Sequence, residues 1–134
     1  MIVVDTNLLA RLLVQGVDTH LAEAVHRRDP DWIAPPLLYS EIRNVLVTLV
    51  RRGALPREQA IAAATEAVII MKGEEIPAST PDVLELAFRS GCTAYDCEFV
   101  AVAKELEATL VTSDRQVLAA FPETAISPEA FVAH

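Results

Sequence analysis

The chain has 134 residues, 52% of them hydrophobic, and a formal net charge of −8 that results from 11 basic and 19 acidic residues. This length allows one domain with a buried core, and the hydrophobic content excludes an intrinsically disordered chain. The excess of acidic residues argues against a broad basic surface for nucleic acid, so a phosphate-bearing substrate would need metal cations or locally placed arginines.

Three features bear on location. Charged residues or glutamine interrupt every apolar run before the roughly 20 residues that a membrane span needs, so we expect no membrane partner. The first residues are strand-like, with neither a basic segment nor a cleavage site, so we expect no secretory signal. Cys92 and Cys97 form no Cys-x-x-Cys pattern and have no paired histidines, which argues against a structural zinc site and favours a reducing, cytoplasmic compartment.

Hydrophobic periodicity and turn residues divide the chain into alternating strands and helices. In chain order, we expect strands over residues 1–4, 32–34, 74–76, 109–112 and 125–126, and helices from about 7 to 16, over 19–28, 37–52, 56–71, 80–90 and 93–106, then a short helix ending at 121 and a helical turn from 128. This alternation predicts one α/β domain over residues 1–134, a three-layer α/β/α sandwich around a mainly parallel sheet of about five strands.

The two long helices over 37–52 and 56–71 are separated by a short turn at Gly53, which predicts an αα-hairpin. Its apolar content exceeds what one face of a small sheet needs. We therefore expect part of it to contact a partner.

Two aspartates follow buried strands directly. Asp5 ends the first strand, and Asp114 follows the strand over 109–112. In parallel α/β sheets, ligands bind outside the carboxyl ends of the strands, so both acids are candidates for one site. A purely local role also remains open, because Asp5 or Thr6 would cap the next helix and Asp114 would favour a helix dipole.

Two further acids fall on or near the apolar faces of helices. Glu41 lies about 60° from Leu38 on the helical wheel, at the edge of the buried stripe. On the helix that starts at Thr93, we expect the buried stripe to centre on Tyr95, Phe99 and Leu106. Asp96 then lies near the inward side, and Glu98 falls on the solvated side with Glu105 and Lys104. A capping interaction of Asp96 with Thr93 is the alternative.

If these four acids lie close together, electrostatic repulsion prevents all of them from being ionised without a counter-charge. Two carboxylates about 5 Å apart repel by roughly 3 kcal/mol at an effective dielectric constant near 20. Such a cluster must take up protons or hold a divalent cation. Because the donors are oxygens without histidine or cysteine nearby, Mg²⁺ or Mn²⁺ is the expected ion.

Four short stretches resemble, in order, the motifs of PIN-domain nucleases, and specifically of the VapC toxins of type II toxin–antitoxin systems. They are Val3–Asn7, Ser40–Glu41, Tyr95–Ala103 and Leu110–Asp114. Each stretch alone is a weak signal, whereas their order and spacing cover nearly the whole chain.

The resemblance implies an endoribonuclease that hydrolyses RNA phosphodiesters with a water activated by Mg²⁺ or Mn²⁺, on a five-stranded parallel sheet. It implies that the metal-binding and catalytic acids are Asp5, Glu41, Asp96 and Asp114. It also implies supporting hydrogen bonds from Thr6, Asn7 and Thr112, a homodimer, and silencing by a VapB-like antitoxin. Arg11 and Arg115 are close to these acids in sequence and are candidates for RNA phosphate contacts, although a surface role is equally open.

The acidic charge departs from family members that grip RNA broadly, so we expect a narrow, locally basic groove or weak non-specific binding. Alternatively, the acidic surface fits a basic antitoxin tail. A competing function is a catalytically silent PIN-like module for dimerisation or antitoxin binding. A haloacid dehalogenase-type phosphotransferase fits less well, because Asn7 stands where that chemistry needs a second aspartate, and the acid pair and late lysine of a receiver domain are absent.

Overall fold

Four parallel strands form the sheet at the centre of the computed structural model, which describes residues 1–133. They are β1 (Ile2–Val4), β2 (Trp32–Ile33), β3 (Thr109–Val111) and β4 (Ala125–Ile126), in the order β2-β1-β3-β4. Val3 pairs with Ile33 on one side and with Leu110 on the other. The first strand is therefore internal to the sheet and flanked by β3, so the carboxyl ends of these two strands meet.

The expectation of a fifth strand over residues 74–76 is not met among residues 1–133. Glu75 forms an isolated parallel bridge with Ala34, and the Ile76 N–H donates to the Ala34 carbonyl at 2.9 Å. The next bond of this ladder would need an N–H at position 36, which is a proline, and a helix begins at Leu37. The pairing beside β2 therefore stops at one bridge.

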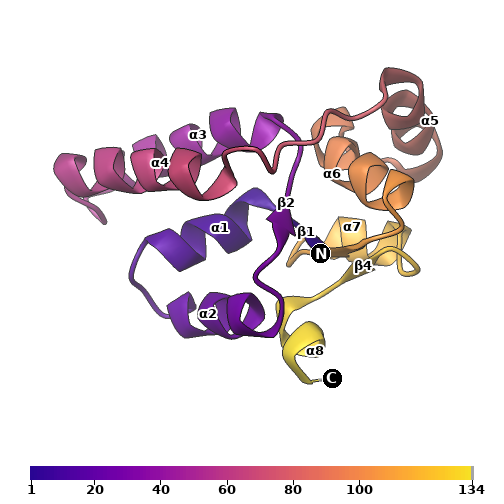
Figure 1. The fold of residues 1–134 in the computed structure, drawn as a ribbon. Coiled ribbons are helices and arrows are strands. Elements are labelled where there is room, and N and C mark those ends of the chain that lie inside the picture. Colours follow the sequence, from indigo (N-terminus) through magenta and orange to yellow (C-terminus); the bar gives the residue numbers. More distant parts are fainter. Residues whose placement is uncertain (134) are drawn as a thin grey trace.

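Eight helices surround the sheet in the described residues (Figure 1). They are α1 (Thr6–Leu13), α2 (Thr19–Arg28), α3 (Leu37–Arg51), α4 (Arg57–Met71), α5 (Thr80–Ser90), α6 (Ala94–Glu105), α7 (Arg115–Ala120) and α8 (Pro128–Ala133). Helix α6 packs on β1 and β3 and is covered by α5, whereas α1 packs on α2 and α2 on α8. Helices thus flank the parallel sheet, and the predicted fold class is confirmed.

The core forms where β1 meets the helices. All three residues of β1 are buried, and Val3 and Val4 are completely inaccessible. Cys97 and Val100 of α6 are likewise inaccessible. Burying an aliphatic side chain of this size stabilises the fold by about 1.5–3 kcal/mol, so this contact fixes α6 over the strand ends.

Helices α3 and α4 form the predicted hairpin. Gly53 adopts φ 74°, and the Ala54 N–H donates to the Leu49 carbonyl at 2.9 Å, which together end α3 in a Schellman motif. The buried side of α4 consists of Ala60, Ala63, Ala67 and Met71.

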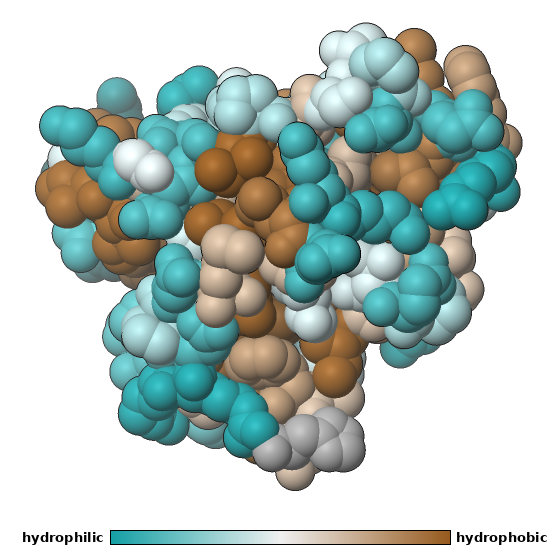
Figure 2. All heavy atoms as spheres, turned by 45° about the vertical axis from the view of Figure 1, so that its right-hand side comes forward, coloured by the Kyte–Doolittle hydropathy of each residue, from teal (hydrophilic) through white to brown (hydrophobic). Residues whose placement is uncertain are grey.

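Hydrophobic side chains remain exposed on two helical surfaces. Figure 2 shows them at the left, over the α3–α4 hairpin, and at the upper right, over α5. They are Val47, Ile61, Val68 and Ile69 on the hairpin, and Leu84 and Phe88 on α5. No helix within residues 1–133 is both long and apolar enough to cross a membrane.

Candidate active site

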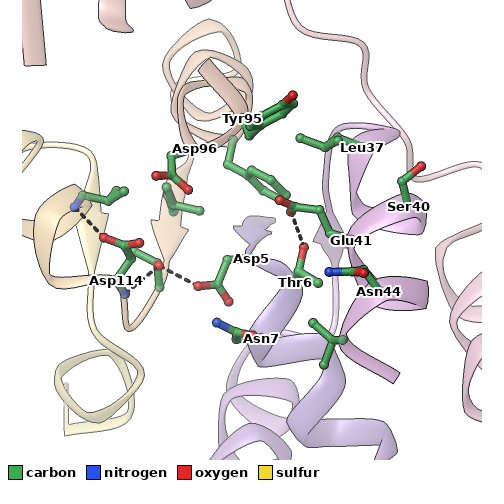
Figure 3. Close-up of a pocket in the computed structure, with 15 residues that line it drawn as sticks. Asp5, Thr6, Asn7, Leu37, Ser40, Glu41, Asn44, Tyr95, Asp96 and Asp114 are labelled. Atoms are coloured by element: carbon green, nitrogen blue, oxygen red, sulfur yellow. Dashed lines mark hydrogen bonds between the residues drawn. The ribbon is translucent and has the colours of Figure 1, made fainter. Parts of the chain in front are cut away.

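A pocket of about 390 Å³ opens at the carboxyl ends of β1 and β3, between α3 and α6. Its lining includes all four acids that the sequence singled out: Asp5, Glu41, Asp96 and Asp114. Figure 3 shows Asp96 descending from α6 towards Asp5 and Asp114, with Glu41 on the opposite wall. The parallel register and the two helices thus bring together acids that are up to 109 positions apart in the sequence.

Asp5 caps a helix and lines the pocket at the same time. One carboxylate oxygen, Oδ1, accepts the Leu8 N–H at 2.8 Å, which caps α1. The other, Oδ2, accepts the Thr112 hydroxyl at 2.6 Å. Burial raises the pKa of Asp5, and the hydrogen bonds from Thr112 and Leu8 only partly oppose this rise. The carboxylate is therefore held in place in a setting that disfavours its charge.

Asp114 repeats this arrangement on the neighbouring strand. Its Oδ1 accepts the Val117 N–H at 2.9 Å and caps α7. Its own N–H donates to Thr112 Oγ1 at 3.1 Å. Thr112 thus contacts both aspartates, so the local capping role and a place in the pocket are not alternatives for these acids.

Glu41 lies on the helical side of the pocket and is held by one hydroxyl. Thr6 Oγ1 donates to Glu41 Oε1 at 2.7 Å (Figure 3). Burial raises the pKa of Glu41, the Thr6 hydrogen bond opposes the rise, and the charges of Asp96 and Asp5 add to it. The repulsion expected between clustered acids is therefore present around Glu41.

Helix α6 differs from its predicted orientation. Asp96 is half-buried, and its N–H donates to Thr93 Oγ1 at 3.0 Å. Its carboxylate makes no hydrogen bond within residues 1–133, so the reciprocal half of the expected capping box is missing. Tyr95, however, is 63% exposed and not part of the core. Glu98 is half-buried instead of solvated, and burial followed by the charge of Glu41 raises its pKa. Phe99 is buried as expected, but so are Cys97 and all residues from Val100 to Ala103, so the helix has no single buried stripe.

The remaining predicted site residues divide into two groups. Asn7 lines the pocket, but its side chain makes no hydrogen bond within residues 1–133. Arg11 and Arg115 lie outside the pocket lining. Arg11 Nη1 donates to Ser113 Oγ at 2.9 Å, and Arg115 is exposed at the start of α7. Asn44, which the sequence reading missed, also lines the pocket. Its position three residues after Glu41, on the same helix face, was the available signal.

The donor set of the pocket is a set of hard oxygens. Carboxylates, hydroxyls and amides are its polar lining groups, which is the chemistry that Mg²⁺ and Mn²⁺ select. With the side chains in these positions, no three His, Cys, Asp or Glu residues of the described chain form a group that could hold a metal ion. Binding an ion would thus require a carboxylate to move inwards.

The parallel sheet flanked by helices, with acids gathered at the ends of β1 and β3, is the arrangement that the sequence motifs led us to expect of a PIN domain. Residues 2–124 match the family model of the PIN domain, and the chain belongs to this family. The family prediction made from the four motifs is therefore confirmed.

Individual proteins of known name or structure are similar to this chain over nearly its whole length. Ribonuclease VapC3 from Pyrobaculum aerophilum is 29% identical over 124 residues, which are 90% of this chain and 95% of that protein. The crystal structure of PAE2754 from the same organism superposes with a TM-score of 0.77 at 25% identity, covering 98% of this chain and 92% of that one. FitAcB from Neisseria gonorrhoeae gives a TM-score of 0.72 at 19% identity, with 96% and 99% coverage, which shows the fold alone.

Proposed function

We propose that the protein is a divalent-metal-dependent endoribonuclease and the toxin of a type II toxin–antitoxin pair, similar to VapC proteins. Membership of the PIN family and the similarity to a relative named Ribonuclease VapC3 support this assignment. The observation that carries it is the convergence of Asp5, Glu41, Asp96 and Asp114 on one pocket. An acidic pocket would repel RNA, so the proposal requires a cation in the site.

The four carboxylates fit Mg²⁺ or Mn²⁺ because two of them have raised pKa values and no cationic side chain in direct contact within residues 1–133. Burial raises the pKa of Asp5 and of Glu41, and the charges of Asp96 and Asp5 raise that of Glu41 further. A bound ion would supply an activated water and would offset charge on the scissile phosphate. The chain's own contribution is orientation. Thr112 holds Asp5 and Asp114, and Thr6 holds Glu41.

Calorimetric titration of Mn²⁺ into the wild type and Asp96→Asn at neutral pH tests the metal site without knowledge of the substrate. We expect saturable binding in the wild type and weakened or abolished binding in the variant. Cleavage of RNA by the wild type in Mg²⁺ or Mn²⁺, with loss of cleavage in chelator, then tests the reaction. Absence of Mn²⁺ binding to purified wild type would favour the catalytically silent module.

We further propose a VapB-like antitoxin and a second copy of the chain as partners, acting in the cytoplasm, where the free thiols of Cys92 and Cys97 would stay reduced. The exposed apolar residues of the hairpin support a protein partner. Val47 and Ile61 line a groove of about 560 Å³ together with three arginines, Arg43, Arg51 and Arg57. This combination suits an acidic, partly apolar segment, so Ile61→Asp should weaken capture of the antitoxin.

A further inference from the structure

A second hollow adjoins the acidic pocket. It has a volume of about 460 Å³ and lies between the end of α1, the loop that follows it, and α3. Asn7 and Val45 line both this hollow and the acidic pocket, so the two share a wall. We name it the Arg11 groove, after its lining residues Asn7, Arg11, Gln15, Asp18, Val45 and Leu49. Its volume is in the range of small-ligand sites.

The walls of the Arg11 groove differ in chemistry from those of the acidic pocket. One side is apolar and includes Val45 and Leu49 of α3. The other carries the amide of Gln15 and the guanidinium of Arg11. Asp18 is its acidic lining residue, and it is paired with Arg11 at 3.8 Å. The groove therefore combines apolar side chains with a cation and an amide, and these groups can contact the base and the phosphate of a nucleotide.

Arg11 lines the groove and is held beside the acidic pocket. Its Nη1 donates to Ser113 Oγ at 2.9 Å, and Ser113 directly precedes Asp114 of the acidic pocket. Its side chain is 30% exposed. A guanidinium has five N–H donors, so the contacts with Ser113 and Asp18 leave donors for a phosphate. Arg11 also lowers the pKa of Asp5 through its charge, although less than burial raises it, which places its positive charge near the acids.

We propose that the Arg11 groove binds the nucleotide adjacent to the scissile phosphodiester, with its phosphate on Arg11 and its base against Val45 and Leu49. This inference rests on the proposed ribonuclease function and states where the RNA strand leaves the acidic pocket. It also explains how a chain with a net charge of −8 contacts RNA. In this groove one held arginine supplies a local positive charge beside the acidic pocket.

The test uses RNA length as its readout. After an RNA cleaved by the wild type in Mg²⁺ has been mapped, oligoribonucleotides are made with two nucleotides around the scissile bond, and with one to three nucleotides added on either side. We expect extension on one side to raise kcat/KM by about tenfold or more, which corresponds to about 1.4 kcal/mol. Extension on the other side should have a smaller effect.

Arg11→Gln and Gln15→Ala should each reduce this gain, so that the extended and the minimal substrate have nearly the same kcat/KM. Arg11→Gln should also reduce the dependence of log kcat/KM on log salt by about 0.7, the value for one phosphate contact to a single strand. Arg27→Gln, which makes the same charge change at an exposed position of α2, should keep both the gain and the salt dependence of the wild type. Melting curves of all three variants report whether the fold is retained, and Gln15→Ala removes no ion pair.

The outcomes separate the inference from the proposed function. Cleavage by the wild type without a gain from extension, or with a gain that both groove variants keep, overturns the Arg11 groove as a nucleotide site and leaves the ribonuclease assignment intact. Failure of the wild type to cleave any RNA in Mg²⁺ or Mn²⁺ overturns both.

Discussion

The two walls of the acidic pocket are built differently. On the strand-end wall, Asp5 and Asp114 each accept a backbone N–H at a helix start and are linked through Thr112. On the helical wall, Glu41 accepts one hydroxyl, and the side chain of Asp96 makes no hydrogen bond within residues 1–133. The strand-end wall is therefore fixed by the fold, whereas the helical wall has side chains that are free to change rotamer.

This difference indicates how the pocket would close around a cation. The Asp5 carboxylate is held by two donors, and the Asp114 carboxylate is tied to the start of α7, so the inward movement needed for metal coordination would fall to Glu41 and Asp96. We expect substitutions on the strand-end wall to disturb the fixed positions of the carboxylates. Those on the helical wall should disturb the movement of carboxylates towards the cation. The following experiments test this distinction.

The largest effect is expected from Asp5→Asn. Asparagine caps a helix as well as aspartate does, so α1 should be retained. Loss of a metal-binding carboxylate should cost more than the roughly 10–100-fold that follows loss of an outer-shell partner. Because the pKa of Asp5 is raised by burial, removing its charge should also stabilise the metal-free protein at neutral pH. RNA cleavage rates and urea unfolding measure the two effects.

Asp82→Asn provides the matched control, because Asp82 is exposed in the first turn of α5. It should change neither cleavage nor stability appreciably. Retained cleavage in Asp5→Asn would show that the strand-end wall is structural and that the site assignment is wrong.

The next effect concerns pH and metal. The folded-state pKa values of Asp5 and Glu41 lie above their ordinary values of 3.8 and 4.5. As pH rises, the unfolded chain therefore loses these protons first, so their contribution to stability is present at low pH and lost as pH passes through the folded pKa values. At neutral pH, Mg²⁺ at 100 times its Kd should raise the free energy of unfolding by about 2.7 kcal/mol.

Urea unfolding in chelator between pH 4 and 8, followed by addition of Mg²⁺, measures this effect. The wild type is compared with the double variant Asp5→Asn, Glu41→Gln, so that other titrating groups cancel. An identical pH dependence of the two proteins would contradict the raised pKa values.

A smaller effect is expected from the supporting hydroxyls. Thr112→Val should lower Mn²⁺ affinity or cleavage by about 10–100-fold, because it removes the partner of both Asp5 and Asp114. Thr6→Val should cost less, since Thr6 supports only Glu41. Thr109→Val, at an exposed position of β3, is the control. Equal effects of Thr112→Val and Thr6→Val on Mn²⁺ titration would remove the distinction between the walls.

The same distinction explains what could be predicted from the sequence. A parallel sheet forces the residues after adjacent strands to one edge, so Asp5 and Asp114 could be placed together from the apolar runs that precede them. The strand over 74–76 was overpredicted, because the apolar pattern of that segment does not show that its partner ends at Pro36 and leaves room for one bridge.

Helix faces were less predictable. On α6, nearly every residue from Cys97 to Ala103 is buried, so the wheel has no clear apolar side, and the expected orientation of Tyr95 and Glu98 was wrong. The hydroxyl contacts of Thr6 and Thr112 depend on distances between elements that a pattern does not contain. Asn44 was missed although its spacing from Glu41 was a signal, because the pattern does not show how far along α3 the pocket extends.

The smallest effect, and the one that most sharpens the comparison, is expected from Glu98→Gln. Glu98 is half-buried and influenced by the charge of Glu41, yet it does not line the pocket. Removing its charge should change the free energy of unfolding by about 0.5 kcal/mol or less and should leave cleavage nearly unchanged. Glu105→Gln, at an exposed position of the same helix, is the control for urea unfolding and cleavage assays. If Glu98→Gln instead abolished cleavage while Glu105→Gln did not, Glu98 would belong to the helical wall. Closure of the pocket would then involve three acids from α3 and α6 rather than two.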